Sequence, residues 1–246
     1  MRDGCIRIVT WNIHAGIGAD RRYNLARIID LVRRHAPDIV ALQEVDSRGR
    51  LEDLPLSALT RALGEYSAEA RTIVAPDGHY GHVLISHWPM HDVRLHDLSV
   101  PRHEARFAIE AGLETPLGRL QVIAAHLGLR AGECRQQVQR LRAIVETVAG
   151  PLVLAGDFND WHGYVRRAFL PLLPGRSREK TFPARYPLLD LDGIYCRPAG
   201  GLIRSWVDRD GRHASDHLPV IADIALRDVS IPGAEHIHKK ITEVLK

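Results

Sequence analysis

The middle of the chain carries five strand-like runs with no helix-like segment between them. Turn residues separate these runs, which cover 71–75, 82–86, 93–100, 105–114 and 117–126. Consecutive strands that are not separated by helices pair as antiparallel hairpins. Any fold of this chain must therefore accommodate a series of antiparallel strands.

Strand-helix-strand units flank this middle region. Helical spacing of apolar residues predicts helices over 23–35, where Pro37 follows, and over 132–150, and a shorter helix before Gly64. Strand-like runs lie next to these helices, at 5–11, 38–45, 152–155 and 217–226. There are too many strands for one open sheet. We therefore predict an α/β fold, a four-layer α/β sandwich in which two mixed β-sheets pack face to face with helices on the outer faces.

The chain has 246 residues, of which 45% are hydrophobic, and it contains no linker-like stretch and no internal repeat. A single catalytic domain over 1–228 is the expected organisation. The segment 229–246 forms a C-terminal tail, with apolar residues spaced as in a short amphipathic helix, although fraying is the safer expectation for a terminus.

Charge and cysteine content limit the partners and the compartment. A net charge of +3 suits an anionic substrate but is too small to require nucleic acid. Cys5, Cys134 and Cys196 are far apart and odd in number, which favours a reducing compartment. The start of the sequence has no signal-peptide pattern, and no stretch reaches the roughly 20 apolar residues of a membrane span. We expect a cytoplasmic protein with no transmembrane segment and no obligate protein partner.

Apolar runs repeatedly end in polar side chains. These are Asn12 in "VTWN", Glu44 in "VALQE", His126 in "VIAAH", and Asp157 and Asn159 in "VLAGDFN"; Asp192 in "LLDLDGIY", and Asp216 and His217 in "ASDH", also adjoin strands. A single polar residue at a strand end usually marks a turn or an exit to solvent. The recurrence of the pattern favours one shared site.

The segment "PLVLAGDFND" indicates what that site does. Asp157 and Asn159, two residues apart on an extended chain, point to the same side, and Gly156 allows close approach of a substrate or another backbone. Carboxylate and amide oxygens are the ligands that Mg²⁺ or Mn²⁺ prefers. With His126 and His217, these groups are suited to metal-assisted attack of water on a phosphate ester.

Seven motifs together resemble the endonuclease/exonuclease/phosphatase superfamily, whose fold is deoxyribonuclease I-like. They are "TWNIH", "IVALQEVD", "YGHVLIS", "AAHLGL", "LAGDFND", "LDGIY" and "SDHLPV", in the order and rough spacing of that family. The match runs from Arg7 to about Leu226, and the short segment "HLGLRAGECRQQ" resembles that of compact bacterial members of unassigned substrate. One departure is His82, which stands where relatives often carry Asn.

The resemblance implies a metal site and a set of catalytic residues. Glu44 and Asp216 would hold Mg²⁺ (or Mn²⁺), and Asn12 would be a further ligand or would bind the phosphate. Asp157 would orient and deprotonate the attacking water, while Asn159 would hold that water or the phosphate. The number of metal ions, one or two, is left open.

Two histidines complete the implied site. His217 would sit on the phosphate with Asp192 behind it, and His126 would stabilise developing charge or protonate the leaving oxygen. Glu104 and Arg106 stand where relatives carry a glutamate that supports the catalytic histidine and an arginine near the substrate. An exposed charged pair at a strand start is an equally good interpretation of these two residues.

The sequence therefore predicts a divalent-metal-dependent phosphohydrolase that cleaves phosphodiester bonds. The substrate is a phosphate ester, and nucleic acid and a small molecule or lipid headgroup remain equal alternatives. A catalytically inactive binding or scaffold protein that retains the fold is the competing hypothesis. It is disfavoured because the motif residues are all present in the sequence.

Overall fold

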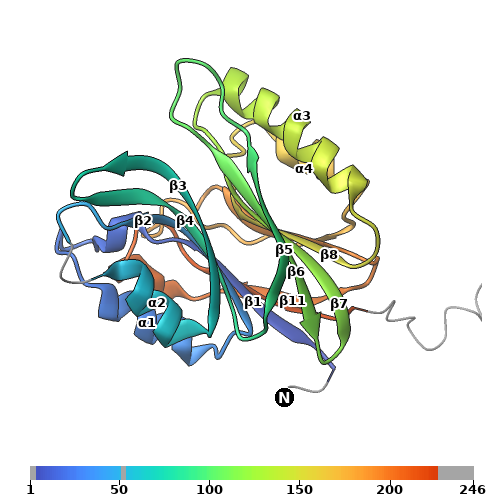
Figure 1. Cartoon of the computed structure of the whole chain (residues 1–246), viewed down its shortest axis with the longest axis horizontal. Coiled ribbons are helices and arrows are strands. Elements are labelled where there is room, and N and C mark those ends of the chain that lie inside the picture. Colours follow the sequence, from blue (N-terminus) through green and yellow to red (C-terminus); the bar gives the residue numbers. More distant parts are fainter. Residues whose placement is uncertain (1–3, 51–53, 227–246) are drawn as a thin grey trace, which may run out of the picture.

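Two six-stranded sheets pack face to face in the computed structural model, which describes residues 4–50 and 54–226 (Figure 1). The predicted tail 229–246 lies outside the described residues. Among the described helices, none is long and apolar enough to cross a membrane.

The first sheet contains the parallel pair formed by strands β1 and β2. Its order is β11 (Leu202–Val207), β12 (Val220–Ile224), β1 (Ile6–Asn12), β2 (Ile39–Asp46), β4 (Gly78–Ser86) and β3 (Tyr66–Ala75). All its other neighbouring strands pair antiparallel.

The second sheet has the same plan around the parallel pair β7 and β8. Its order is β5 (Met90–Asp97), β6 (Phe107–Thr115), β7 (Gly118–His126), β8 (Leu152–Asp157), β10 (Asp192–Arg197) and β9 (Gly175–Arg176). Here too the other neighbours are antiparallel.

Helices connect the parallel strands and cover the outer faces. Helix α1 (Leu25–Arg34) links β1 to β2 and packs beside α2 (Pro55–Leu63), while α3 (Ala131–Thr147) links β7 to β8 and packs beside α4 (Tyr164–Phe169) (Figure 1). The side chain of Asn24 caps α1 by accepting a hydrogen bond from the Arg27 backbone N–H. Pro55 begins α2. Gly64 follows the helix, where the sequence predicts its end.

Three apolar clusters hold the four layers together. One lies between the two sheets and includes Ile8, Ile109 and Val153. The second lies under α3 and α4, and the third lies under α1 and α2. The predicted four-layer α/β sandwich is confirmed. The sequence patterns did not indicate β9, β11 or α4, which are short or lack a clean apolar periodicity.

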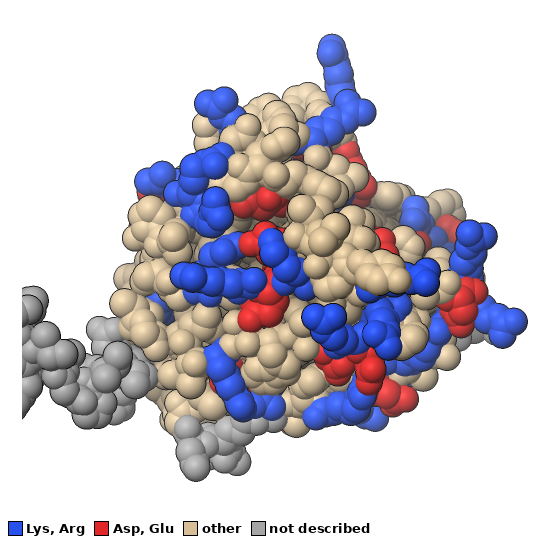
Figure 2. All heavy atoms as spheres, turned by 180° about the vertical axis from the view of Figure 1, so that it is seen from behind, with Lys and Arg blue, Asp and Glu red and all other residues tan. Residues whose placement is uncertain are grey.

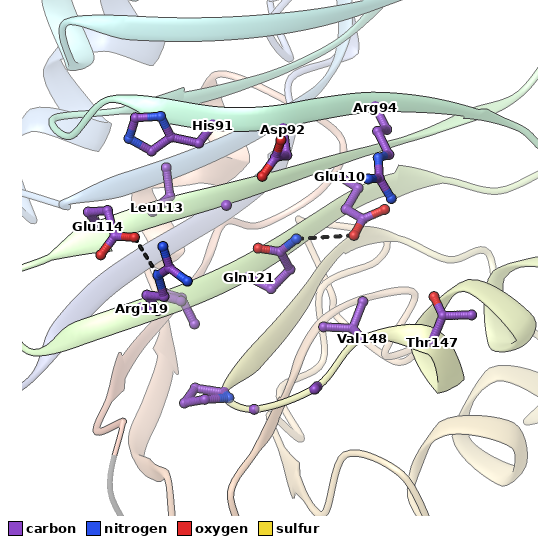
Figure 3. A pocket seen from close by; sticks show the side chains of 15 residues that line it. His91, Asp92, Arg94, Glu110, Leu113, Glu114, Arg119, Gln121, Thr147 and Val148 are labelled. Carbon is purple, nitrogen blue, oxygen red and sulfur yellow. Dashed lines mark hydrogen bonds and ion pairs between the residues drawn. The ribbon is translucent and has the colours of Figure 1, made fainter.

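A hollow of about 1050 Å³ lies on the outer face of the second sheet, beside the end of α3 (Figure 3). Polar side chains of β5, β6 and β7 line it, including Arg94, Glu110 and Gln121. It lies near the start of β7 and β8, because Arg119 and Pro151 belong to its wall. The polar residues that end these two strands, His126 and Asp157, therefore lie at the opposite end of the strands from the hollow.

Candidate active site

The topology brings the polar strand ends of both sheets together. In each sheet the two parallel strands run in the same direction, so their carboxyl ends lie side by side. Asn12 at the end of β1 therefore lies near Glu44 in β2. Likewise His126 ends β7, and Asp157 ends β8 in register with it. Because the sheets pack face to face, the carboxyl ends of the two parallel pairs meet at one end of the sandwich.

The last two motifs are fixed to this end by hydrogen bonds. Asp192 begins β10 directly opposite Asp157. His217 lies before β12, where its carbonyl oxygen accepts a hydrogen bond from the Trp11 indole at 2.9 Å. Ser215 Oγ donates to the Asn12 carbonyl oxygen at 2.7 Å. Buried hydrogen bonds therefore tie the "SDH" segment to the end of β1.

Gly156 is required by the neighbouring strand. A Cβ atom at this position would lie 1.9 Å from the Ala125 carbonyl oxygen, and its φ is +155°. The close approach that the sequence indicated is therefore to another backbone, that of β7, and it sets the position of Asp157 relative to His126.

Two of the candidate residues have backbones in the left-handed region, where side chains other than glycine are uncommon. Glu44 has a φ of 59° beside a bulge in the pairing of β2 with β4, and Asn159 has a φ of 47°. Such conformations cluster at functional sites, because the surrounding structure must hold them in place.

Asp157 is at the centre of the buried site. It is 1% exposed, and its carboxylate accepts hydrogen bonds from Asn12 Nδ2 and from the Asn159 backbone N–H, each at 3.0 Å. Burial and the nearby charge of Asp192 raise its pKa to about 7, against the opposing effects of His217 and the two asparagines. A carboxylate with a pKa near neutrality is suited to act as a base.

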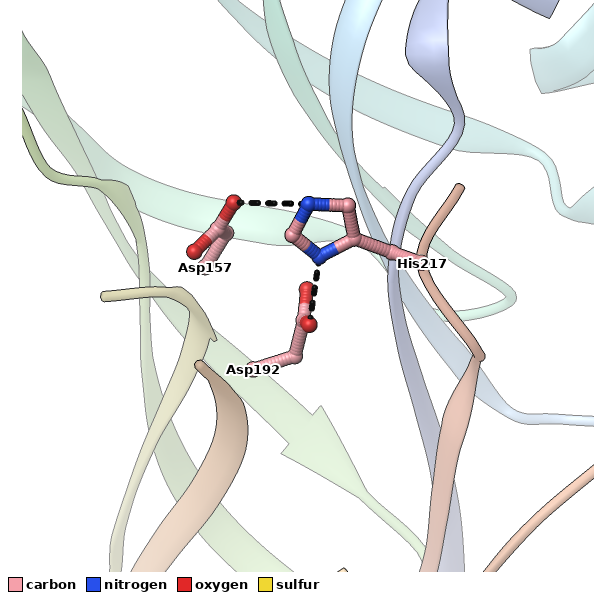
Figure 4. A group of neighbouring side chains, drawn as sticks. All are labelled: Asp157, Asp192 and His217. Atoms are coloured by element: carbon pink, nitrogen blue, oxygen red, sulfur yellow. Dashed lines mark hydrogen bonds and ion pairs between the residues drawn. The ribbon is translucent and has the colours of Figure 1, made fainter. Parts of the chain in front are cut away.

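His217 stands between two carboxylates (Figure 4). Its Nδ1 donates to Asp192 Oδ2 at 2.7 Å, and its Nε2 lies 3.9 Å from Asp157 Oδ2. Burial alone would lower the pKa of His217, but the carboxylates, with Asp192 foremost, raise it to about 10. The ring is therefore an imidazolium at neutral pH, oriented by Asp192.

His126 approaches the same Asp157 oxygen from β7, the strand that pairs with β8 on the side opposite β10. Its Nε2 lies 3.7 Å from Asp157 Oδ2, and its Nδ1 lies 3.2 Å from Arg106 Nη1. Burial, followed by the charge of Arg106, lowers the pKa of His126 well below its usual value. Arg106 also bonds Glu104 Oε1 at 3.2 Å, so Glu104 reaches His126 through Arg106.

Glu44 and Asp216 each place a carboxylate near His14, at the rim of the site. His14 Nδ1 lies 3.8 Å from Glu44 Oε2 and 3.5 Å from Asp216 Oδ1, and the side chain of Asp216 is 46% exposed. The side chain of Glu44 is 24% exposed, so both residues offer carboxylate oxygens that solvent reaches. Such oxygens suit Mg²⁺ or Mn²⁺, which bind few carboxylates and keep several waters.

Asn12 adjoins this carboxylate pair. Its Oδ1 accepts from the His14 backbone N–H at 3.0 Å, which turns its amide nitrogen toward Glu44 Oε1 at 2.9 Å. Oδ1 has a second lone pair, and Asn12 could offer this oxygen to a cation.

The ligand-capable atoms of Asp157, Asp192 and His217 also lie within 4.8 Å of one another, in a fully buried group. The 2.7 Å bond between His217 Nδ1 and Asp192 identifies part of this group as a carboxylate–imidazole pair. Glu44 and Asp216 are more exposed than this group, and they offer the carboxylate oxygens that a hard cation prefers.

Three features near the site were not predicted from the sequence. The Phe182 ring packs 4.8 Å from the His217 ring and meets Trp161 edge to face. His14 separates the two rim carboxylates. A hollow of about 210 Å³ next to Asp216 has Arg185 and Arg212 in its wall. Phe182 and Arg185 belong to a Pro-rich segment without periodicity, so no sequence signal placed them here.

Comparison with known proteins identifies the family of this chain. Residues 9–217 match the model of the endonuclease/exonuclease/phosphatase family. The uncharacterized protein YbhP from Escherichia coli is 32% identical over an alignment of 248 positions, which covers 89% of this chain and 96% of YbhP.

Two solved structures are similar in fold. An endonuclease/exonuclease/phosphatase from Beutenbergia cavernae has a TM-score of 0.69 and 22% identity, covering 90% of this chain and 72% of that one. The 3′ phosphatase NExo from Neisseria, bound to product DNA hairpin, has a TM-score of 0.64 and 22% identity, covering 89% and 99%. The chain belongs to the endonuclease/exonuclease/phosphatase family, whose members are divalent-metal-dependent hydrolytic enzymes that act on phosphate esters.

Proposed function

We propose that this protein is a divalent-metal-dependent phosphohydrolase that cleaves phosphodiester bonds by attack of water. The observation that carries the proposal is the convergence of two imidazoles on one buried carboxylate oxygen. Asp157 Oδ2 lies 3.7 Å from His126 Nε2 and 3.9 Å from His217 Nε2. A phosphate bound here would meet a base and two nitrogen donors, which match the charge that develops in phosphoryl transfer.

The residues have distinct tasks in this proposal. Asp157 accepts a proton from water while the water oxygen attacks phosphorus. His217 Nε2 gives its proton to the leaving oxygen as that P–O bond breaks. Asn12 and the Asn159 backbone hold Asp157 in place by the hydrogen bonds to its two oxygens. Asp192 holds the His217 ring through Nδ1.

Glu44 and Asp216 would hold the cation, with Asn12 Oδ1 as a third oxygen. When bound, Mg²⁺ or Mn²⁺ would neutralise negative charge on the phosphate. The three oxygens belong to β1, β2 and the segment before β12, so the first sheet provides them all. The second sheet provides Asp157 and His126.

The distribution of charge on the surface favours a substrate that the protein contacts at only a few phosphate groups. Figure 2 shows Lys and Arg spread over one face with Asp and Glu between them, and the net charge is +3. Arg185 and Arg212 in the hollow beside Asp216 are placed to accept an anionic group close to the reacting bond. A nucleic-acid end or a small phosphodiester fits this arrangement better than a long duplex, which requires many phosphate contacts. NExo, similar in fold, is bound to a product DNA hairpin.

A substrate panel tests the proposal. Bis-p-nitrophenyl phosphate, plasmid DNA, single-stranded and abasic DNA, phospholipids and inositol phosphates are each assayed with Mg²⁺, Mn²⁺ or EDTA. We expect hydrolysis of at least one phosphodiester with metal and none in EDTA. Asp157→Asn should lower that activity about 10²–10⁴-fold with the fold intact. Asp77→Asn, which changes a carboxylate in the turn between β3 and β4, should leave the activity unchanged.

Activity that persists in EDTA, or full activity of Asp157→Asn, would contradict the mechanism. An inactive binding or scaffold protein is the alternative. It would bind phosphate esters without cleaving any of them, with or without metal.

A further inference from the structure

Arg106 is a buried cation with two partners on one nitrogen atom. Its Nη1 lies 3.2 Å from Glu104 Oε1 and 3.2 Å from His126 Nδ1, and the residue is 6% exposed. The two hydrogens of Nη1 are sufficient for both bonds. Glu104 is in turn held by Thr72, whose hydroxyl donates to Glu104 Oε1 at 3.0 Å.

The contact with Arg106 determines which ring nitrogen of His126 carries the proton. A guanidinium has only donors and stays protonated in proteins. His126 Nδ1 must therefore accept, and the ring proton must be on Nε2. Because Nε2 is the atom that faces Asp157 Oδ2 at 3.7 Å, His126 presents an N–H to the site.

The two histidines of the site thus have opposite partners. Asp192, a carboxylate, accepts from Nδ1 of His217, whereas Arg106, a cation, donates to Nδ1 of His126. The first partner stabilises an imidazolium, and the second stabilises a neutral ring. His82, fully buried and near enough to Arg106 to feel its charge, is also kept neutral, with a pKa lowered to about 4 by burial and by that charge.

We propose that Arg106 is a positioning residue that fixes His126 as the neutral Nε2–H tautomer, so that His126 stabilises a phosphate oxygen by hydrogen bonding and does not protonate the leaving group. The catalytic consequence rests on the proposed function, but the tautomer does not. His126 keeps its proton through the reaction. The proton for the leaving oxygen comes from His217, so the two histidines are not interchangeable.

Nitrogen-15 NMR of the labelled full-length protein at pH 7.5 tests the tautomer directly. The His126 ring is assigned by comparison with His126→Gln. We expect a protonated Nε2 and an unprotonated Nδ1. A proton on Nδ1, or on both nitrogens, would overturn the proposal without any variant of Arg106 and without any assay of activity.

Three substitutions of Arg106 extend the test. Arg106→Lys retains a donor for Nδ1 and should keep the Nε2–H tautomer. Arg106→Met removes the donor and should give a mixture of both tautomers. Arg106→Glu puts an acceptor beside Nδ1 and should move a proton onto it. A folded Arg106→Glu protein with an unchanged His126 tautomer would contradict the proposal.

Kinetics with bis-p-nitrophenyl phosphate separate positioning from substrate binding. Arg106→Met should lower kcat about tenfold or more with little change in KM, and Arg106→Lys should recover part of the loss. Arg94→Met, on β5 in the wall of the distant hollow (Figure 3), is the matched control and should leave both constants unchanged. If Arg106→Met raised KM alone and left the tautomer intact, Arg106 would be a substrate-binding residue. If the wild-type protein cleaved nothing, the proposed function would fail, while the NMR result would still decide the tautomer.

Discussion

Asp192 lies directly opposite Asp157 in the ladder between β10 and β8, and the two carboxylates face different nitrogens of one histidine. Both aspartates are buried, so two negative charges at adjacent strand ends would repel each other strongly. The imidazolium of His217 relieves this repulsion. The arrangement leaves Asp192 paired at 2.7 Å and Asp157 free to take up a proton near neutral pH.

Replacing Asp192 by Asn should therefore impair His217. Without the carboxylate, the effect of burial would be opposed only by Asp157 and Asp216, so the pKa of His217 would fall from about 10. Less of the ring would then be charged at pH 8, and kcat should fall by about 10²-fold or more. The loss should be smaller at pH 6, where more of the imidazolium survives. NMR titration of His217 and pH-rate profiles measure both effects.

Asp190→Asn is the control for this experiment. Asp190 is two residues away, is half-buried and pairs with Arg176 and Lys180. It should leave the pH profile unchanged. An unaltered His217 titration in Asp192→Asn would show that the carboxylate does not determine the charge of the ring.

Glu44→Gln should weaken cation binding. The substitution keeps the size of the side chain and removes one of the two charges that face His14 at the rim. Changing residues behind a metal ligand typically costs 10–100-fold in affinity, so loss of the ligand charge itself should cost at least about tenfold. Calorimetric titration with Mg²⁺ or Mn²⁺ measures this, with the exposed Glu65→Gln as a control. Equal affinities of Glu44→Gln and wild type would remove Glu44 from the metal site.

Gly156→Ala should destabilise the fold. The added Cβ would lie 1.9 Å from the Ala125 carbonyl oxygen at a φ of +155°, and a backbone atom cannot yield as a flexible side chain can. We expect a loss of about 3 kcal/mol and a drop in Tm of about 10 °C. Gly132→Ala, in the first turn of α3 with no atom within 4 Å of the new Cβ, should be neutral or slightly stabilising. Similar Tm values for the two variants would contradict the steric argument.

The sequence could predict the four layers and most of the strands because those strands are buried. Their apolar runs are long and end abruptly in polar residues such as Asn12, His126 and Asp157, which a linear pattern reveals. Strand β11 was not predicted, because it lies at a sheet edge and its side chains alternate poorly in burial. Short edge strands depend on their neighbours more than on their own residues.

The partners of the site residues were harder to predict than the residues themselves. Arg106 and His126 are 20 positions apart, and only the pairing of β6 with β7 brings them together. The packing of the Phe182 ring against His217, at an interplanar angle of 45°, depends on a loop whose path no periodic pattern specifies. Which nitrogen of a histidine bears the proton is likewise a property of the contact and not of the sequence motif.

Asp223 in β12 accepts hydrogen bonds from arginines of both neighbouring strands, Arg7 in β1 and Arg204 in the edge strand β11. It is buried, and its oxygens accept hydrogen bonds from Arg7 Nε at 2.6 Å, Arg7 Nη2 at 2.8 Å and Arg204 Nε at 2.7 Å. Burial alone would raise the pKa of Asp223, but the two guanidinium groups lower it below its usual value. Asp223→Asn leaves Arg7 buried without its counter-ion and should cost about 3 kcal/mol at pH 7.

The difference between Asp223→Asn and wild type should depend on pH with a definite sign. A carboxyl whose pKa is lowered in the folded state stabilises the protein fully above its unfolded pKa of about 4. That stabilisation is lost as the pH falls below this value and through the folded pKa. Urea unfolding should therefore show the full difference from pH 7 down to about pH 5 and a shrinking difference below pH 4. Asp210→Asn, which breaks an exposed pair with Arg34, should cost at most about 1 kcal/mol at pH 7. A pH-independent difference for Asp223→Asn would mean that lost packing, and not the ion pair, destabilises the variant.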